Sequence, residues 1–160
     1  MRLHVLAVGR LKAGPEKLLA GDYRTRIEGL GRQAGITRLS VADTSESQAQ
    51  TPVARMVEEQ RFFASTLPDK AFAIVLDERG KSMTSPAFAA LLRRHIDGGT
   101  ADLAFLIGGP DGHAPATREA AGLLLCLGAM TWPHRLARVM LFEQIYRAVT
   151  IMVNHPYHRP

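Results

Sequence analysis

Five short apolar runs alternate with segments whose apolar residues repeat at helical spacing, and this alternation limits the fold more than any other feature of the chain. The runs are rich in branched side chains and cover residues 3–8, 36–42, 71–76, 102–107 and 123–127. Strands that are apolar almost throughout are typical of parallel sheets covered by helices on both faces. The sequence therefore predicts a single α/β domain, residues 1–160, with a mainly parallel sheet flanked by helices.

Proline and glycine mark the predicted helix ends. Pro15, Pro52 and Pro86 each open a helical pattern, as proline is tolerated in the first turn. The predicted helices run from Pro15 to about residue 30, then over 52–66, 85–96, 116–121 and 135–153. The segments 43–50, 77–82 and 128–134 are expected to be loops.

Composition narrows the cellular setting and the partners. The chain has 46% hydrophobic residues, enough for one sizeable core, and a formal net charge of +5, which suits a polyanionic partner such as RNA or DNA. Its one cysteine, Cys126, lies in an apolar run and is expected to be a buried hydrophobe. A lone thiol fits a reducing compartment, and no apolar run is long enough to span a membrane. These features predict a cytoplasmic protein.

Two nucleotide-binding motifs can be rejected. Residues 80–82 echo the end of a phosphate-binding loop, but Val75 stands where that motif needs its first glycine. No G-x-G-x-x-G fingerprint follows the first predicted strand. The sequence thus indicates neither ATP nor NAD.

Two loops follow apolar strands in the last third of the chain. The first is the turn 108–112, Gly-Gly-Pro-Asp-Gly, and the second covers residues 127–134. Ligands in open α/β sheets bind at the carboxyl ends of strands, where glycine lets the backbone approach closely. Each loop can also be an ordinary connection, a tight turn in the first case and a loop with Trp132 packed in the core in the second. Together they favour a shared ligand pocket.

The last predicted helix is apolar on nearly all sides and must be covered. A domain of this size has little room to bury it completely, so a subunit interface is a reasonable hypothesis. Arg147 interrupts the apolar surface and lies four residues after Glu143, the spacing of a simple ion pair.

The C-terminal tail, residues 154–160, concentrates reactive side chains between two prolines. His155 and His158 can accept protons near neutral pH, whereas Tyr157 and Arg159 suit base stacking and phosphate contact. The ordinary expectation for a terminal segment is fraying. A metal site is not expected, because no cluster supplies further ligands.

Four stretches together resemble one known family. They are 106–112 (LIGGPDG), 133–134 (PH), 143–148 (EQIYRA) and the closing 154–159 (NHPYHR). On these residues the chain is similar to the ribosomal large subunit methyltransferase H family of the SPOUT superfamily. The resemblance covers the whole length and is sharpest in the last third.

The resemblance implies properties that no periodicity reveals. The fold would carry a C-terminal trefoil knot, and the protein would be a homodimer. The cofactor would be S-adenosylmethionine, and the substrate a pseudouridine in large-subunit ribosomal RNA, methylated at N3 within the assembled ribosome. The cofactor contacts carried over from the family fall on Leu76, Gly108, Leu127, Gly128, Ala129, Met130, Thr131 and Trp132.

The tail would then supply the catalytic chemistry. A methyl sulfonium is already an activated electrophile, so positioning the base and removing the N3 proton are the main tasks. His155 or His158 from the partner subunit is expected to assist deprotonation, with Arg147 or Arg159 holding phosphate or negative charge and Tyr157 stacking on the base. His134 is a further candidate base. Rival readings are a transfer-RNA or ribose methyltransferase and a non-catalytic ribosome-binding protein.

Overall fold

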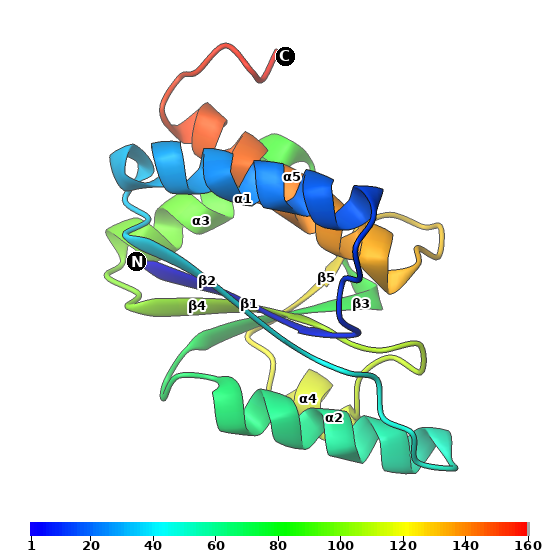
Figure 1. Ribbon diagram of the computed structural model, residues 1–160. Coiled ribbons are helices and arrows are strands. Elements are labelled where there is room, and N and C mark those ends of the chain that lie inside the picture. The colour runs from blue at the N-terminus through cyan, green and yellow to red at the C-terminus, as the bar shows by residue number, and fades with distance from the viewer. Residues whose placement is uncertain (160) are drawn as a thin grey trace.

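The computed structural model describes residues 1–159, which form a five-stranded sheet between two layers of helices (Figure 1). The strands are β1 (Arg2–Val8), β2 (Arg38–Thr44), β3 (Phe72–Ser82), β4 (Asp102–Ile107) and β5 (Leu123–Cys126). The helices are α1 (Pro15–Ala34), α2 (Pro52–Thr66), α3 (Ser85–Asp97), α4 (Pro115–Glu119) and α5 (His134–Met152). The predicted α/β architecture and element order are confirmed.

All strand pairs are parallel, in the order β2-β1-β4-β3-β5. All six residues of β4 are buried, because this strand lies in the middle of the sheet and is covered on both faces. Alternate residues of β1 face opposite layers. Leu3 and Val5 join the larger core with α1, α3 and α5, and Leu6 and Val8 join a smaller core with Phe63 of α2. Figure 1 shows α2 and α4 together on that second face.

Local sequence signals account for the helix ends. Thr51 Oγ1 accepts a hydrogen bond from Ala54 N at 3.2 Å and so caps α2. Thr84 caps α3 in the same way, one residue before the predicted start. Gly35 ends α1 in the left-handed conformation, with φ of 94°.

The prediction for residues 77–82 was wrong, because this segment continues β3 rather than forming a loop. Leu125 of β5 pairs with Leu76 and again with Lys81, so an irregularity in β3 lies between the two pairings. A charged sequence can remain in a strand here because only one neighbour, β5, borders it. A Cβ on Gly80 would lie 2.6 Å from the backbone carbonyl carbon of Leu125, so only glycine fits this crossing.

Smaller differences from the predictions concern the bounds of one strand and the burial of one side chain. Strand β2 runs two residues later than predicted and takes in the start of the expected 43–50 loop. Cys126 was expected to be buried, but it is half-buried at the end of β5, where its Sγ donates to the Gly128 carbonyl at 2.9 Å. Among residues 1–159, no helix is long and apolar enough to cross a membrane.

Candidate active site

The carboxyl ends of β1, β3, β4 and β5 meet at one edge of the sheet, and two adjoining cavities open there. The larger, about 490 Å³, lies between the glycine turn 108–112 and the loop that leads into α5. The smaller, about 150 Å³, lies between the end of β5 and residues 76–78. Leu76, Thr131, Trp132 and Ala137 line both cavities. The structure therefore brings the two loops singled out in the sequence into one site.

The glycine turn is held in a narrow hairpin. Gly112 N donates to the Gly109 carbonyl at 3.0 Å, and Gly112 itself has φ of 79°, a conformation that favours glycine. A Cβ on Gly108 would lie 3.0 Å from the Gly112 carbonyl oxygen. Gly108 and Gly112 are thus needed for the turn to close on itself while its outer side borders the larger cavity.

Helix α2 contacts the glycine turn through Arg55 and Glu59. These two residues are four apart in sequence and so share one helix face. Arg55 makes two hydrogen bonds to the Asp111 carboxylate, at 2.6 and 3.0 Å, and a third to the Ala49 carbonyl at 3.0 Å. The Glu59 carboxylate lies against Gly109, where a Cβ would come within 2.9 Å of both carboxylate oxygens. The turn is therefore positioned by α2 and the loop before it.

Burial changes the acid–base behaviour of two groups in this region. Burial raises the pKa of Glu59, while hydrogen bonds from the backbone of Ser47 and Gly109 oppose the rise. Burial also lowers the pKa of His113, which follows the turn, to about 4, so its ring is neutral at neutral pH. The His113 ring packs on Phe63 with centroids 5.4 Å apart. His113 is buried and lines the larger cavity, so it packs in the wall of the site.

His134 begins α5 at the rim of the larger cavity. Its Nε2 lies 3.3 Å from Glu46 Oε1, and a Cβ on Gly9 would lie 2.6 Å from the same nitrogen. Burial lowers the pKa of His134, with Glu46 acting in the opposite direction. A neutral imidazole at this rim can accept a proton.

Two side chains of the second loop are exposed rather than packed. Met130 is 73% exposed and Trp132 is 40% exposed. The alternative in which Trp132 packs in the core is therefore wrong. Exposed apolar side chains beside a cavity are suited to covering a bound ligand.

The tail packs on its own chain and is not frayed over the described part. The Tyr157 hydroxyl donates to Glu143 Oε1 at 3.0 Å, and the Arg147 guanidinium lies 4.9 Å from the centre of the Tyr157 ring. Arg147 also bonds Glu143, at 2.9 Å through Nε, so the expected i,i+4 ion pair is present. Burial raises the pKa of Tyr157. His155 precedes Tyr157 in the tail, and His158 and Arg159 follow it.

Comparison with known proteins decides the family. A match to the family described as "Predicted SPOUT methyltransferase" covers residues 1–158. The chain belongs to the SPOUT methyltransferases.

Several curated proteins are similar to this SPOUT methyltransferase over its full length. A protein named "Ribosomal RNA large subunit methyltransferase H" from Rhodopseudomonas palustris (strain HaA2) is 51% identical over 159 residues, covering 99% of both chains. The protein of the same name from Bradyrhizobium sp. (strain ORS 278) is 47% identical and covers 99% of this chain and 98% of its own.

Solved structures share the fold at low identity. A probable methyltransferase from Bordetella pertussis Tohama I superposes with a TM-score of 0.52 at 13% identity, covering 92% of this chain and 95% of its own. A probable methylase family protein from Haemophilus influenzae Rd KW20 has a TM-score of 0.52 at 10% identity, with 99% and 70% coverage. These two likenesses concern the fold alone.

Within a single chain of this SPOUT methyltransferase, the site residues predicted from the sequence lie in two separate groups. The expected cofactor set lies at the cavities, since every member except Ala129 lines one of them. The expected catalytic set, His155, His158, Arg147, Tyr157 and Arg159, lies at the far end of α5. That helix has 19 residues and so separates its start at His134 from the tail by about 27 Å. Figure 1 shows the tail above α1 and α5, away from the strand-end loops.

Sequence reasoning missed the α2 residues that support the glycine turn. Arg55 and Glu59 lie in an ordinary amphipathic helix, and nothing in their spacing reveals that they contact a turn about fifty residues later. The acidic Asp111 in the Gly-Gly-Pro-Asp-Gly turn was the one signal of a basic partner, and it did not show which residue that partner is.

Proposed function

We propose that this chain transfers the methyl group of S-adenosylmethionine to N3 of a pseudouridine in large-subunit ribosomal RNA, acting on the assembled ribosome in the cytoplasm. The proposal is supported by membership of the SPOUT methyltransferases and by full-length relatives named for methylation of this RNA. The observation that carries it is the joining of the glycine turn and the Trp132 loop around one pair of cavities.

The cavities suit the proposed cofactor in size and chemistry. The larger has about 490 Å³, within the range of small-ligand sites, and is mostly lined by apolar groups and strand-end backbone. Glu78 lines the smaller cavity and provides negative charge for a cationic ligand, whereas Asp77, which also lines it, is paired with Arg118 at 3.9 Å. When bound, the sulfonium group would supply an activated methyl. Leu76, Gly108 and the residues 127–132 would hold it, with Trp132 covering the site.

The chain's own part in the reaction is to position the base and receive its proton. The N3–H of a pseudouridine is weakly acidic, so a neutral imidazole near it favours loss of the proton. His155 and His158 are the proposed acceptors, with His134 at the cavity rim as the alternative. Arg147 and Arg159 would hold phosphate or the developing negative charge, and Tyr157 would stack on the base.

The proposal includes a homodimer in which the tail of one subunit completes the cavity of the other. Within one chain the tail is about 27 Å from His134, too far to act on a base in the cavities. The neighbouring helices α1 and α5 also expose three leucines, Leu18 at 76%, Leu19 at 45% and Leu136 at 42%. Exposed apolar side chains on adjacent helices favour a subunit interface.

The proposal also includes a trefoil knot in the C-terminal third. The tight crossing of β3 and β5 at Gly80 supports it, because close passage of chain segments is required where one segment threads another.

Modification mapping tests the reaction. Mass analysis of ribosomal RNA from cells with and without the gene is expected to show one pseudouridine that loses a single methyl group in its absence. A difference at a transfer RNA or at a ribose hydroxyl would instead favour the rival methyltransferase readings. If calorimetry detects no S-adenosylmethionine binding at millimolar concentration, the protein is a binding module and the enzyme proposal is wrong.

Mixed dimers test the shared site. A subunit with His155→Ala and His158→Ala is inactive in this scheme, and so is a subunit with Gly108→Val. After mixing the two equally, about a quarter of wild-type activity should return, because half of the dimers hold one complete site. Absence of any recovery in dimers shown to exchange subunits would contradict a tail acting in trans. Full activity of the double histidine variant would remove both residues from the mechanism.

A further inference from the structure

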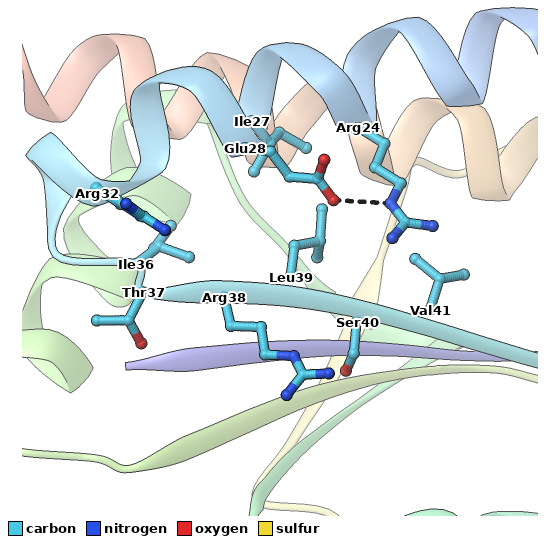
Figure 2. A pocket seen from close by; sticks show the side chains of 10 residues that line it. All are labelled: Arg24, Ile27, Glu28, Arg32, Ile36, Thr37, Arg38, Leu39, Ser40 and Val41. Atoms are coloured by element: carbon cyan, nitrogen blue, oxygen red, sulfur yellow. Dashed lines mark hydrogen bonds and ion pairs between the residues drawn. The ribbon is translucent and has the colours of Figure 1, made fainter.

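A groove follows the free edge of β2, where that strand faces α1 (Figure 2). One cavity of about 540 Å³ is lined by Arg24 and Arg32 from α1 and by Arg38 from β2. A second, of about 410 Å³, adjoins it through Arg24 and Val41 and adds Arg10 and Lys17. The two together are called the edge groove. Strand β2 has seven residues, so the groove follows it for about 20 Å.

The edge groove concentrates most of the chain's excess positive charge. Six cationic and two acidic side chains line it, an excess of four against five for the whole chain. Both acidic groups are already paired, Glu28 with Arg24 at 2.9 Å and Asp43 with Arg138 at 2.9 Å. Arg10, Lys17, Arg32 and Arg38 have no carboxylate within 4.0 Å among residues 1–159. Four cations are therefore available to an external anion.

The arrangement suits an extended polyanion better than a single ion. Figure 2 shows Arg24 and Arg32 on the α1 side of β2 and Arg38 on the opposite side, so the cationic groups flank the strand along its length. The apolar side chains of Leu39 and Val41 lie between them and form a floor. Guanidinium groups suit bidentate contact with phosphate, and an apolar floor accommodates sugar and base surfaces.

One end of the edge groove reaches the candidate active site. Arg138, which lines the groove, donates a hydrogen bond to the Gly9 carbonyl. A Cβ on Gly9 would in turn lie 2.6 Å from Nε2 of His134, which lines the larger cavity. A strand lying in the groove therefore ends beside the place where the target base would bind.

We infer that the edge groove binds the phosphodiester backbone of the ribosomal RNA strand next to the target nucleotide, an inference that rests on the function proposed above. Arg32 and Arg38 contact phosphates at the far end, and Arg10 and Lys17 do so near the active site. A different role for arginines on an edge strand is to prevent pairing with another sheet. That role predicts aggregation when they are removed, with no change in RNA affinity for the protein that stays monodisperse.

The test removes the far-end cations and compares them with matched cations elsewhere. The groove variant is Arg32→Gln with Arg38→Gln, and the control is Arg61→Gln with Arg94→Gln, two exposed arginines that line neither cavity. Methyl transfer to purified ribosomes is measured against ribosome concentration at several salt concentrations. For the groove variant, KM for ribosomes should rise about tenfold with little change in kcat. The slope of log kcat/KM against log salt should become less steep by about one to two units.

Three further measurements distinguish the possible outcomes. The control pair should behave as wild type, and S-adenosylmethionine affinity by calorimetry should be the same in all three proteins. The pair Arg32→Lys with Arg38→Lys keeps the positive charge, so it should retain the wild-type salt slope. Its KM should rise less than that of the glutamine pair. The lysine pair replaces the glutamine pair if the latter aggregates. With an active wild type, an unchanged KM and salt slope in the glutamine pair would overturn the inference and leave the proposed function standing. Where the lysine pair replaces it, an unchanged KM alone would do so.

Ribosome cosedimentation measures binding of each variant to ribosomes independently of catalysis. If the wild type does not methylate ribosomes, the proposed function fails. The groove inference then stands only if the glutamine pair still weakens ribosome binding about tenfold relative to the control pair. Equal binding by all variants would reject it.

Discussion

Arg55 and Asp111 lie 56 residues apart in sequence, yet the guanidinium of one holds the carboxylate of the other with hydrogen bonds of 2.6 and 3.0 Å. The contact ties α2, on one face of the sheet, to the glycine turn at the rim of the larger cavity. About a quarter of each side chain is exposed, so water weakens the pair without removing it. The turn that would contact the cofactor is thus positioned by a helix that does not itself line the larger cavity.

Removing this support should weaken cofactor binding. For Arg55→Ala we expect the Kd for S-adenosylmethionine to rise about tenfold, equivalent to about 1.4 kcal/mol, because the turn loses its two charge-assisted bonds and becomes mobile. Calorimetric titration measures the change. Arg61→Ala on the same helix is the control, and a double-mutant cycle with Asp111→Asn should show coupling of about 1 kcal/mol. A Kd within twofold of wild type would show that the turn keeps its shape alone.

The Arg138–Asp43 pair should respond unequally to loss of either partner. Arg138 has a side chain only 2% exposed, whereas that of Asp43 is 32% exposed. Asp43→Ala leaves a buried cation with only the Gly9 carbonyl for support and should cost about 3 kcal/mol of stability. Arg138→Met leaves a carboxylate that water can reach, and should cost about 1 kcal/mol. Urea unfolding at pH 7 measures both, and the reverse order would contradict this account.

The crossing of β3 and β5 should not tolerate a side chain at Gly80. A Cβ there would meet backbone atoms of Leu124 and Leu125 at 2.6–2.7 Å, and backbone cannot move aside as a flexible side chain can. Gly80→Ala is expected to lower the free energy of unfolding by about 3 kcal/mol. Gly29→Ala is the matched control, since nothing lies within 4 Å of its Cβ position in α1, and it should stabilise by about 0.5–1 kcal/mol. Equal effects of the two changes would show that the crossing is looser than described.

Stability should fall on mild acidification through His113. Its pKa is lowered from 6.5 to about 4 in the folded state, so the unfolded chain binds the proton first. The stability it contributes is therefore complete above pH 6.5 and is lost as pH falls towards 4, about 3 kcal/mol in all. His113→Leu should remove that part of the pH dependence.

The comparison is made by urea unfolding of both proteins between pH 7 and 4. Because Glu59 and other groups titrate in both, only the difference between the two curves reports His113. Curves that stay parallel over this interval would contradict the assignment.

The sequence by itself determined the architecture and indicated which segments are expected to form the site. Apolar strands alternating with helices predicted the parallel sheet, and strand-end glycine and tryptophan loops predicted where a ligand would bind, since these signals depend on neighbours in sequence. The closing NHPYHR and the glycine turn carried the family resemblance, which the match over residues 1–158 bears out.

Only the tertiary structure decided which distant residues support or approach that site. Arg55 reaches Asp111, and charged residues 77–82 remain in β3. Four cations that have no carboxylate partner among residues 1–159 gather along β2, because packing brings together segments that local pattern does not relate. It also placed the tail about 27 Å from the cavity rim, a separation set by the 19 residues of α5. The tail residues and the strand-end loops were both identified from the sequence, but only the fold shows that they lie far apart within one chain.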